Sequence, residues 1–191
     1  MDLGISDKVA PILAEVKHFI DTEILPLEYE YHQEVEKGDR WAFTERQTEI
    51  METLKAKAKQ KNLWNFFLTH FEGGHGLNTV EYAYIAEETG RSQLAPEVFN
   101  CAAPDTGNME TLERYASEAI KDEWLEPLLR GDIRSAFLMT EPDVASSDAT
   151  NVQCSIERDG DHYVVNGRKW WSSGAGDPRC AIYIVMGKTD P

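Results

Sequence analysis

Two short segments of the sequence carry most of the side chains that suit a polar ligand. FLMTEPDVASSDATN (residues 137–151) runs from apolar residues through Thr-Glu-Pro into Asp and Ser, and KWWSSGAG (residues 169–176) joins two tryptophans to two serines. No helical or strand period continues through either segment, so free amides and hydroxyls are expected there. Such groups can bind the polar edge of a heterocycle or a pyrophosphate. Each segment taken alone is more typical of an ordinary turn, and a tandem Trp is more typical of core packing than of a cofactor platform.

Composition excludes several classes of partner. The 191 residues include 34 acidic and 19 basic side chains, which gives a formal charge of −15. This charge argues against nucleic-acid binding and against adsorption to an anionic membrane. No apolar run approaches the roughly 20 residues that span a bilayer, and the N-terminus has no signal-like pattern. Three widely spaced cysteines without a C-x-x-C favour a reducing compartment. A cytoplasmic protein is therefore expected.

Helical periodicity dominates the first two-thirds of the chain. Apolar residues at helical spacing predict a helix within residues 6–37, which Pro26 should kink or break. Thr44 and Gln47 form a capping-box pattern that predicts the start of a second helix. Three further helices are predicted over residues 79–88, 103–117 and 117–131.

Strand-length periods begin near residue 135. The predicted strands are residues 135–140, 153–160, 162–173 and 180–187. Asp159-Gly160 and Asn166-Gly167 are dipeptides typical of hairpin turns. Helices followed by strands predict an α+β fold. We expect an N-terminal all-α bundle over residues 1–134 and the beginning of an antiparallel β-barrel-like domain over 135–191. So short a sheet cannot bury both faces, so we expect the chain to be the N-terminal portion of a longer protein.

The paired motifs resemble the flavin-binding region of the acyl-CoA dehydrogenases. LLRGDIRSAFLMTEPDVASSDATN followed by YVVNGRKWWSSGAGDPR is similar in order and spacing to that family's Thr-Glu-Pro…Ser-Asp and N-G-x-K-x-W-x-[ST] pattern. The TEPDVASSDATN variant resembles a subfamily whose animal members are fused to a kinase-like domain. The resemblance covers essentially the whole chain. It implies FAD as the cofactor and an acyl-CoA as the substrate.

The resemblance also implies roles for single residues. The strand Phe137–Thr140, which includes Leu138 and Met139, would meet the pyrimidine edge of the flavin ring. Ser147 would lie near the flavin pyrophosphate and the bound acyl-CoA. The loop has one residue more than the family's common form, so Ser146 and Ser147 are both kept as candidates. In the second motif the candidates are Trp171, which would lie on the flavin face away from substrate, Ser172, and Ser173, which would lie at flavin N5.

No catalytic base is assigned to this chain. The resemblance implies that this residue belongs to a C-terminal helical domain, which we expect to lie outside these 191 residues, so these residues alone are expected to be inactive. Glu141 and Asp148 are expected to hold the turn. The function expected of the parent protein is flavin-dependent α,β-dehydrogenation of an acyl-CoA, with electron-transfer flavoprotein as the acceptor and a homodimer or homotetramer as the assembly. An oxidase or flavin monooxygenase of the same fold, or a non-catalytic relic that binds CoA or protein, remain alternatives.

A metal site is not predicted. His70 and His75 flank a glycine-rich turn, but no third ligand is near them in the sequence. Solvated histidines in a turn are the favoured interpretation.

Overall fold

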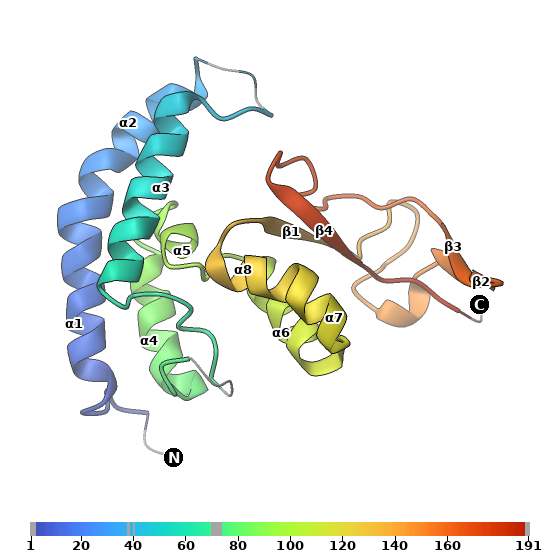
Figure 1. Ribbon diagram of the computed structural model, residues 1–191, viewed down its shortest axis with the longest axis horizontal. Helices are drawn as coiled ribbons and strands as arrows, with labels where there is room; N and C mark the ends of the chain where they lie inside the picture. Colours follow the sequence, from blue (N-terminus) through green and yellow to red (C-terminus); the bar gives the residue numbers. More distant parts are fainter. Residues whose placement is uncertain (1–2, 38, 40, 70–73, 190–191) are drawn as a thin grey trace. The chain divides into compact units, whose positions relative to one another are not determined.

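The computed structural model describes residues 3–37, 39, 41–69 and 74–189 of the chain (Figure 1). The chain forms two compact units, residues 1–106 and 107–191. The change from helix to strand near residue 134 therefore lies inside the second unit, which begins with helices.

The first unit is helical throughout its regular structure. Its helices are α1 (Val9–Phe19), α2 (Leu25–Val35), α3 (Glu45–Gln60), α4 (Thr79–Thr89) and α5 (Ala95–Val98). The predicted capping box is confirmed: the Gln47 amide donates to the Thr44 hydroxyl, and the Gln47 side chain accepts from the Thr44 amide. This capping box gives hydrogen-bond partners to two backbone amides at the helix N-terminus, where amides have no partner within the helix.

The alternative that Pro26 breaks the first helix is wrong, whereas the kink stays a prediction. The chain passes from α1 into α2 through one π-helical turn, Ile20–Ile24, in which the Leu25 amide donates to the Ile20 carbonyl. Pro26 has no amide to donate and crowds the preceding turn, so the helix widens locally instead of ending. The helical segment from α1 to α2 therefore stays continuous, and its buried residues lie in α1 and the π-helical turn.

An aromatic cluster lies at the centre of the first unit. The rings of Phe19 and Phe66 lie 5.6 and 5.9 Å from the ring of Phe99, and all three are fully buried. Ile20 and Leu54 are also at 0% exposure and belong to the same core. Edge-on and tilted aromatic pairs of this kind stabilise a core beyond the area that they bury.

Helices also open the second unit. α6 (Asp105–Tyr115) is followed by α7 (Glu118–Ile120), a π-helical turn over Lys121–Leu125 and α8 (Glu126–Arg130). The π-helical turn again precedes a proline, Pro127. The predicted end at Gly131 is confirmed, because this glycine takes the left-handed conformation with φ of 72°.

The antiparallel sheet predicted for residues 135–187 is wrong for two of its four strands. β1 (Arg134–Leu138) pairs with β4 (Cys180–Val185) in parallel, with Ser135 opposite Ile182 and Leu138 opposite Val185. Parallel neighbours need a long crossover connection, and residues 139–179 supply one. Only β2 (Ser155–Asp159) and β3 (His162–Asn166) are antiparallel. Neither two-stranded sheet is closed in the described residues, so the barrel-like closure stays a prediction.

The two hairpin dipeptides have different outcomes. Asp159 pairs with His162, so the predicted hairpin forms with Gly160 and Asp161 as its turn, and Gly160 has φ of 61°. At Asn166-Gly167 the prediction is wrong, because β3 ends there and residues 167–173 do not form the predicted strand. Gly167 instead lies against Cys154, where the contact leaves no room for a Cβ atom.

Candidate functional site

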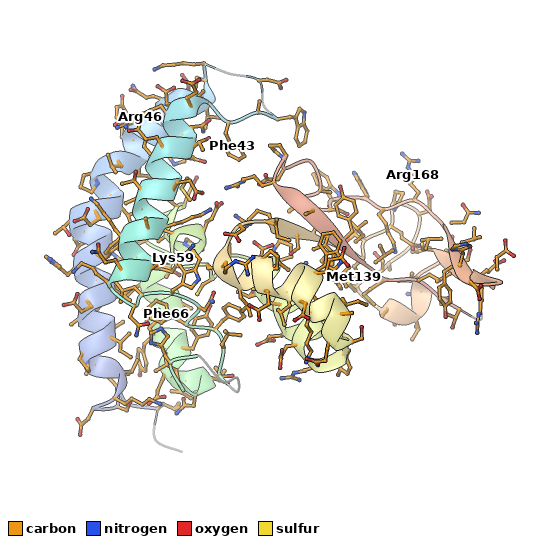
Figure 2. All side chains as sticks on the ribbon, viewed as in Figure 1. Phe43, Arg46, Lys59, Phe66, Met139 and Arg168 are labelled. Atoms are coloured by element: carbon orange, nitrogen blue, oxygen red, sulfur yellow. The ribbon has the colours of Figure 1, made fainter. Side chains whose placement is uncertain are left out.

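The end of β1 and the KWWSSGAG segment lie together in the second unit. The Trp170 amide donates to the Thr140 carbonyl at 2.8 Å, and Lys169 Nζ donates to the Met139 carbonyl at 3.0 Å. At the last residue of β1, the Leu138 carbonyl accepts from the Met186 amide at 3.0 Å. Figure 2 labels Met139 beside the end of β1. These bonds bring the two motifs into one site, although about 30 residues separate them in the chain.

Glu141 organises the turn that follows β1. Its carboxylate accepts hydrogen bonds from the Gln153 amide at 2.7 Å, the Cys154 amide at 2.9 Å and Lys169 Nζ at 2.9 Å. Glu141 is buried and Lys169 is partly buried, with side-chain exposures of 5% and 11%. The hydrogen bond from Lys169 is the largest cause that lowers the pKa of Glu141, to about 2. The prediction that Glu141 holds the turn is confirmed by these contacts.

This ion pair gives an expected pH dependence. Because the folded-state pKa of Glu141 is lowered to about 2, its contribution to stability is complete above its unfolded pKa of 4.5 and is lost as the pH falls toward 2. We therefore expect hydrogen-exchange protection of the Gln153 and Cys154 amides to be constant above about pH 5 and to fall below pH 4. Protection that stays constant down to pH 3 would contradict this assignment. Protection of the Met186 amide, which is bonded to the Leu138 carbonyl, is the internal control.

The two candidate serines of the first motif have different surroundings. Ser146 is buried, and its hydroxyl accepts from the Glu141 amide at 3.0 Å. Ser147 is exposed. Asp148 accepts from the amide and the hydroxyl of Thr150, and the side-chain bond is the largest cause that lowers the pKa of Asp148. Of the two serines, Ser147 is therefore the one whose hydroxyl faces solvent.

The WWSS segment makes a tight turn. Trp171 has φ of 56°, in the left-handed region, and the Ser173 amide donates to the Trp171 carbonyl at 2.9 Å. Trp171 and Ser173 are exposed. The hydroxyl oxygen of Ser172 is buried and has no hydrogen-bond partner among the described residues. This turn thus leaves the Trp171 indole and the Ser173 side chain exposed next to each other in the chain.

Sequence reasoning missed two residues of this site. Lys169 joins the two motifs through Met139 and Glu141, and Trp170 stacks on Trp171. The lysine of the N-G-x-K pattern was the available signal for Lys169, because lysine is rarely buried unless it is paired. Arg168, by contrast, is exposed and its side chain extends away from the ribbon (Figure 2).

The histidine and the cysteines outside this site are the other candidates for metal binding or reactivity. The expectation of a solvated histidine is wrong for His75, which is partly buried: its ring lies 4.7 Å from the Phe66 ring, its Nε2 lies 3.0 Å from the Trp64 carbonyl, and burial lowers its pKa. His70 lies outside the described residues. No group of three or more potential metal ligands occurs in the described ranges. The three cysteines are free, and burial raises the pKa of Cys101 to about 11. In the part of the chain that the structure describes, no helix is long and apolar enough to cross a membrane.

The fold and the paired motifs define a class, and comparison with known proteins identifies it. Residues 6–132 match the family model "Acyl-CoA dehydrogenase, N-terminal domain", and residues 136–191 match "Acyl-CoA dehydrogenase, middle domain". The chain belongs to the acyl-CoA dehydrogenase family.

Its relatives include animal and bacterial proteins. Human acyl-CoA dehydrogenase family member 11 is 56% identical over 182 residues, which are 93% of this chain and 22% of the human protein. A structure named as an acyl-CoA dehydrogenase from Mycobacterium abscessus is 50% identical, with a TM-score of 0.89, over 98% of this chain and 47% of that one. An acyl-CoA dehydrogenase from Bacillus anthracis solved with FAD is 26% identical, with a TM-score of 0.65, over 97% of this chain and 30% of that one. The chain thus spans about a fifth to a half of these relatives.

Proposed function

We propose that this chain is part of an enzyme that oxidises an acyl-CoA thioester between its α and β carbons with FAD. The observation that carries the proposal is the junction of two family motifs, where Lys169 and Trp170 bond to the end of β1. Family membership and the relative solved with FAD support it. When bound, FAD supplies the acceptor for the hydride that leaves the β carbon.

The donor set of the site fits a flavin. Ser147 and Ser173 offer exposed hydroxyls, Trp171 offers an exposed indole, and residues 137–140 supply a strand end with polar backbone groups. A planar heterocycle with a polar edge and a pyrophosphate needs a flat apolar wall together with hydrogen-bond donors. We assign residues 137–140 to the pyrimidine edge, Trp171 to the ring face and Ser147 to the pyrophosphate and the acyl-CoA. Ser146 supports the turn behind these groups through its bond from the Glu141 amide, and Ser172 stays a candidate for contact with the flavin.

Glu141 does not act as the catalytic base in this proposal. Its carboxylate already accepts three hydrogen bonds and is paired with Lys169, and a pKa of about 2 makes it a weak base. Asp148 is likewise bonded to Thr150. We therefore assign α-proton removal to a carboxylate outside this site. Electron-transfer flavoprotein as the acceptor and a homodimer or homotetramer as the assembly belong to the same proposal.

Ser173→Ala in the full-length protein tests this assignment. The hydroxyl of Ser173 is proposed to donate to flavin N5, where electron density grows during reduction, so its loss should slow flavin reduction by about 10- to 100-fold. Stopped-flow absorbance with a panel of acyl-CoAs gives the reduction rate. Ser117→Ala is the matched control, because Ser117 is exposed and makes no side-chain capping bond.

Two outcomes would contradict the proposed function. A full-length protein that is colourless and cannot be reconstituted with FAD would favour a binding protein without redox activity. A flavoprotein whose reduced form reacts rapidly with oxygen while the enoyl product is bound would favour an oxidase. An unchanged reduction rate in Ser173→Ala would remove Ser173 from N5 but leave the reaction class intact.

A further inference from the structure

Two adjacent tryptophans stack on each other at the surface of the second unit. The ring centroids of Trp170 and Trp171 lie 4.9 Å apart, and the ring planes are inclined by 31°. Both side chains remain open to solvent, with exposures of 50% for Trp170 and 73% for Trp171. Such a pair is unusual, because large aromatic side chains are normally covered by a core or by a partner.

The stack depends on an uncommon backbone conformation. Successive side chains of an extended segment point to opposite sides, so two neighbouring indoles would ordinarily be kept apart. Trp171 has φ of 56°, a left-handed conformation that bulky residues rarely adopt. This conformation allows both rings to lie on one side. Strained backbone at an exposed residue is a reason to look for a binding role.

Hydrogen bonds fix the backbone of the pair but leave its rings free. The Trp170 amide is bonded to the Thr140 carbonyl, and the Trp171 carbonyl accepts from the Ser173 amide. Neither bond restrains the side-chain torsions of the two indoles. Among the described residues, Trp170 is the aromatic residue whose ring lies against that of Trp171. The orientation of the Trp171 ring therefore depends on its contact with Trp170.

We propose that Trp170 is a positioning residue, whose indole holds the Trp171 ring in the orientation that receives the flavin. The inference rests on the proposed function, in which Trp171 lies on the flavin face. Preorganisation is the physical basis: a ring that is already held in place loses less conformational freedom when the flavin binds. Trp170 itself need not touch the flavin.

The test compares four variants of the full-length protein with the wild type. Stacked indoles give an exciton couplet in the circular dichroism spectrum of the flavin-free protein, and this couplet should vanish in both Trp170→Leu and Trp171→Leu. The rate of FAD dissociation should rise about 3- to 10-fold in Trp170→Leu and further in Trp171→Leu. Trp170→Phe keeps a flat ring and should restore slow dissociation. Trp41→Leu removes an exposed tryptophan of the first unit and should change neither signal.

The results that would contradict the positioning role of Trp170 differ from the result that would contradict the proposed function. A Trp170→Leu protein that lacks the couplet but releases FAD at the wild-type rate overturns the positioning role and leaves the proposed function intact. Rapid FAD release that Trp170→Phe does not correct also overturns it, because the planar contact would then not be the cause. A wild-type protein without the couplet shows that the pair is not stacked in solution. Failure of the wild type to bind FAD at all removes the proposed function, and this inference with it.

Discussion

Lys169→Met is expected to lower the free energy of unfolding of the second unit by about 3–5 kcal/mol. The substitution keeps most of the apolar stem but leaves the buried Glu141 carboxylate without its cation, and it removes the donor to the Met139 carbonyl. An uncompensated buried charge is more costly than a buried pair is stabilising. Native-state hydrogen exchange of the Gln153 and Cys154 amides measures this free energy locally.

Two companion variants separate the charge from the packing. Glu141→Gln in the Lys169→Met background removes the unpaired charge and should recover part of the lost stability, since an amide oxygen still accepts from the Gln153 or Cys154 amide. Lys37→Met is the surface control, because Lys37 pairs with Glu34 on an exposed helix end and should cost under about 1 kcal/mol. Equal losses for Lys169→Met and Lys37→Met would show that the Glu141 pair is not effectively buried.

The helices could be predicted because their signals are local. Thr44 and Gln47 reach each other across one turn, and Gly131 ends α8 by its own backbone freedom. Such patterns need no information from distant parts of the chain. The π-helical turn before Pro26 was not foreseen, because a helix can end, kink or widen at a proline and the sequence does not say which; the second π-helical turn also precedes a proline, Pro127.

The strand arrangement could be predicted only in part, because pairing is a long-range property. Strand periods located β1 to β4, but periodicity carries no direction, so the parallel pairing of β1 with β4 was not apparent. Asn166-Gly167 looked like a hairpin turn, yet the packing of Gly167 against Cys154 decides that region. Local turn propensity was overridden there by tertiary contact.

In the candidate site, the exposed residues could be predicted from the sequence, but the contacts that hold them could not. Its exposed hydroxyls and indole, at Ser147, Ser173 and Trp171, were named from the motifs, and the structure leaves all three facing solvent. The supporting contacts were not foreseen, because Lys169 and Glu141 are 28 residues apart and nothing in either motif states that they pair. Residues that present chemistry can thus be named from sequence, whereas the residues that hold them require coordinates.

Gly167→Ala is expected to destabilise the second unit by about 3 kcal/mol, at the upper end of the usual cost of overpacking. A Cβ atom on Gly167 would lie 2.7 Å from Cys154 Cβ and 2.9 Å from Cys154 Cα. Cys154 cannot move aside easily, because its amide is bonded to Glu141 and its carbonyl accepts from the Lys188 amide at 2.8 Å. The strain should therefore spread to both of these bonds, and the exchange protection of the Cys154 and Lys188 amides should fall together.

Gly107→Ala is the matched control for this prediction. Gly107 lies within α6, where an added Cβ meets no atom within 4 Å, so the same substitution should stabilise the protein by roughly 0.5–1 kcal/mol through helix propensity. The two changes add an identical methyl group and are expected to act with opposite sign. If Gly167→Ala were neutral, the contact with Cys154 would have to be looser in solution, and the bonds from Cys154 to Glu141 and Lys188 would not hold that segment in place. Cys154→Gly in the Gly167→Ala background removes the Cys154 Cβ that the new methyl group meets, so it should recover part of the lost stability. Cys154→Ala in the same background keeps that Cβ and should recover less.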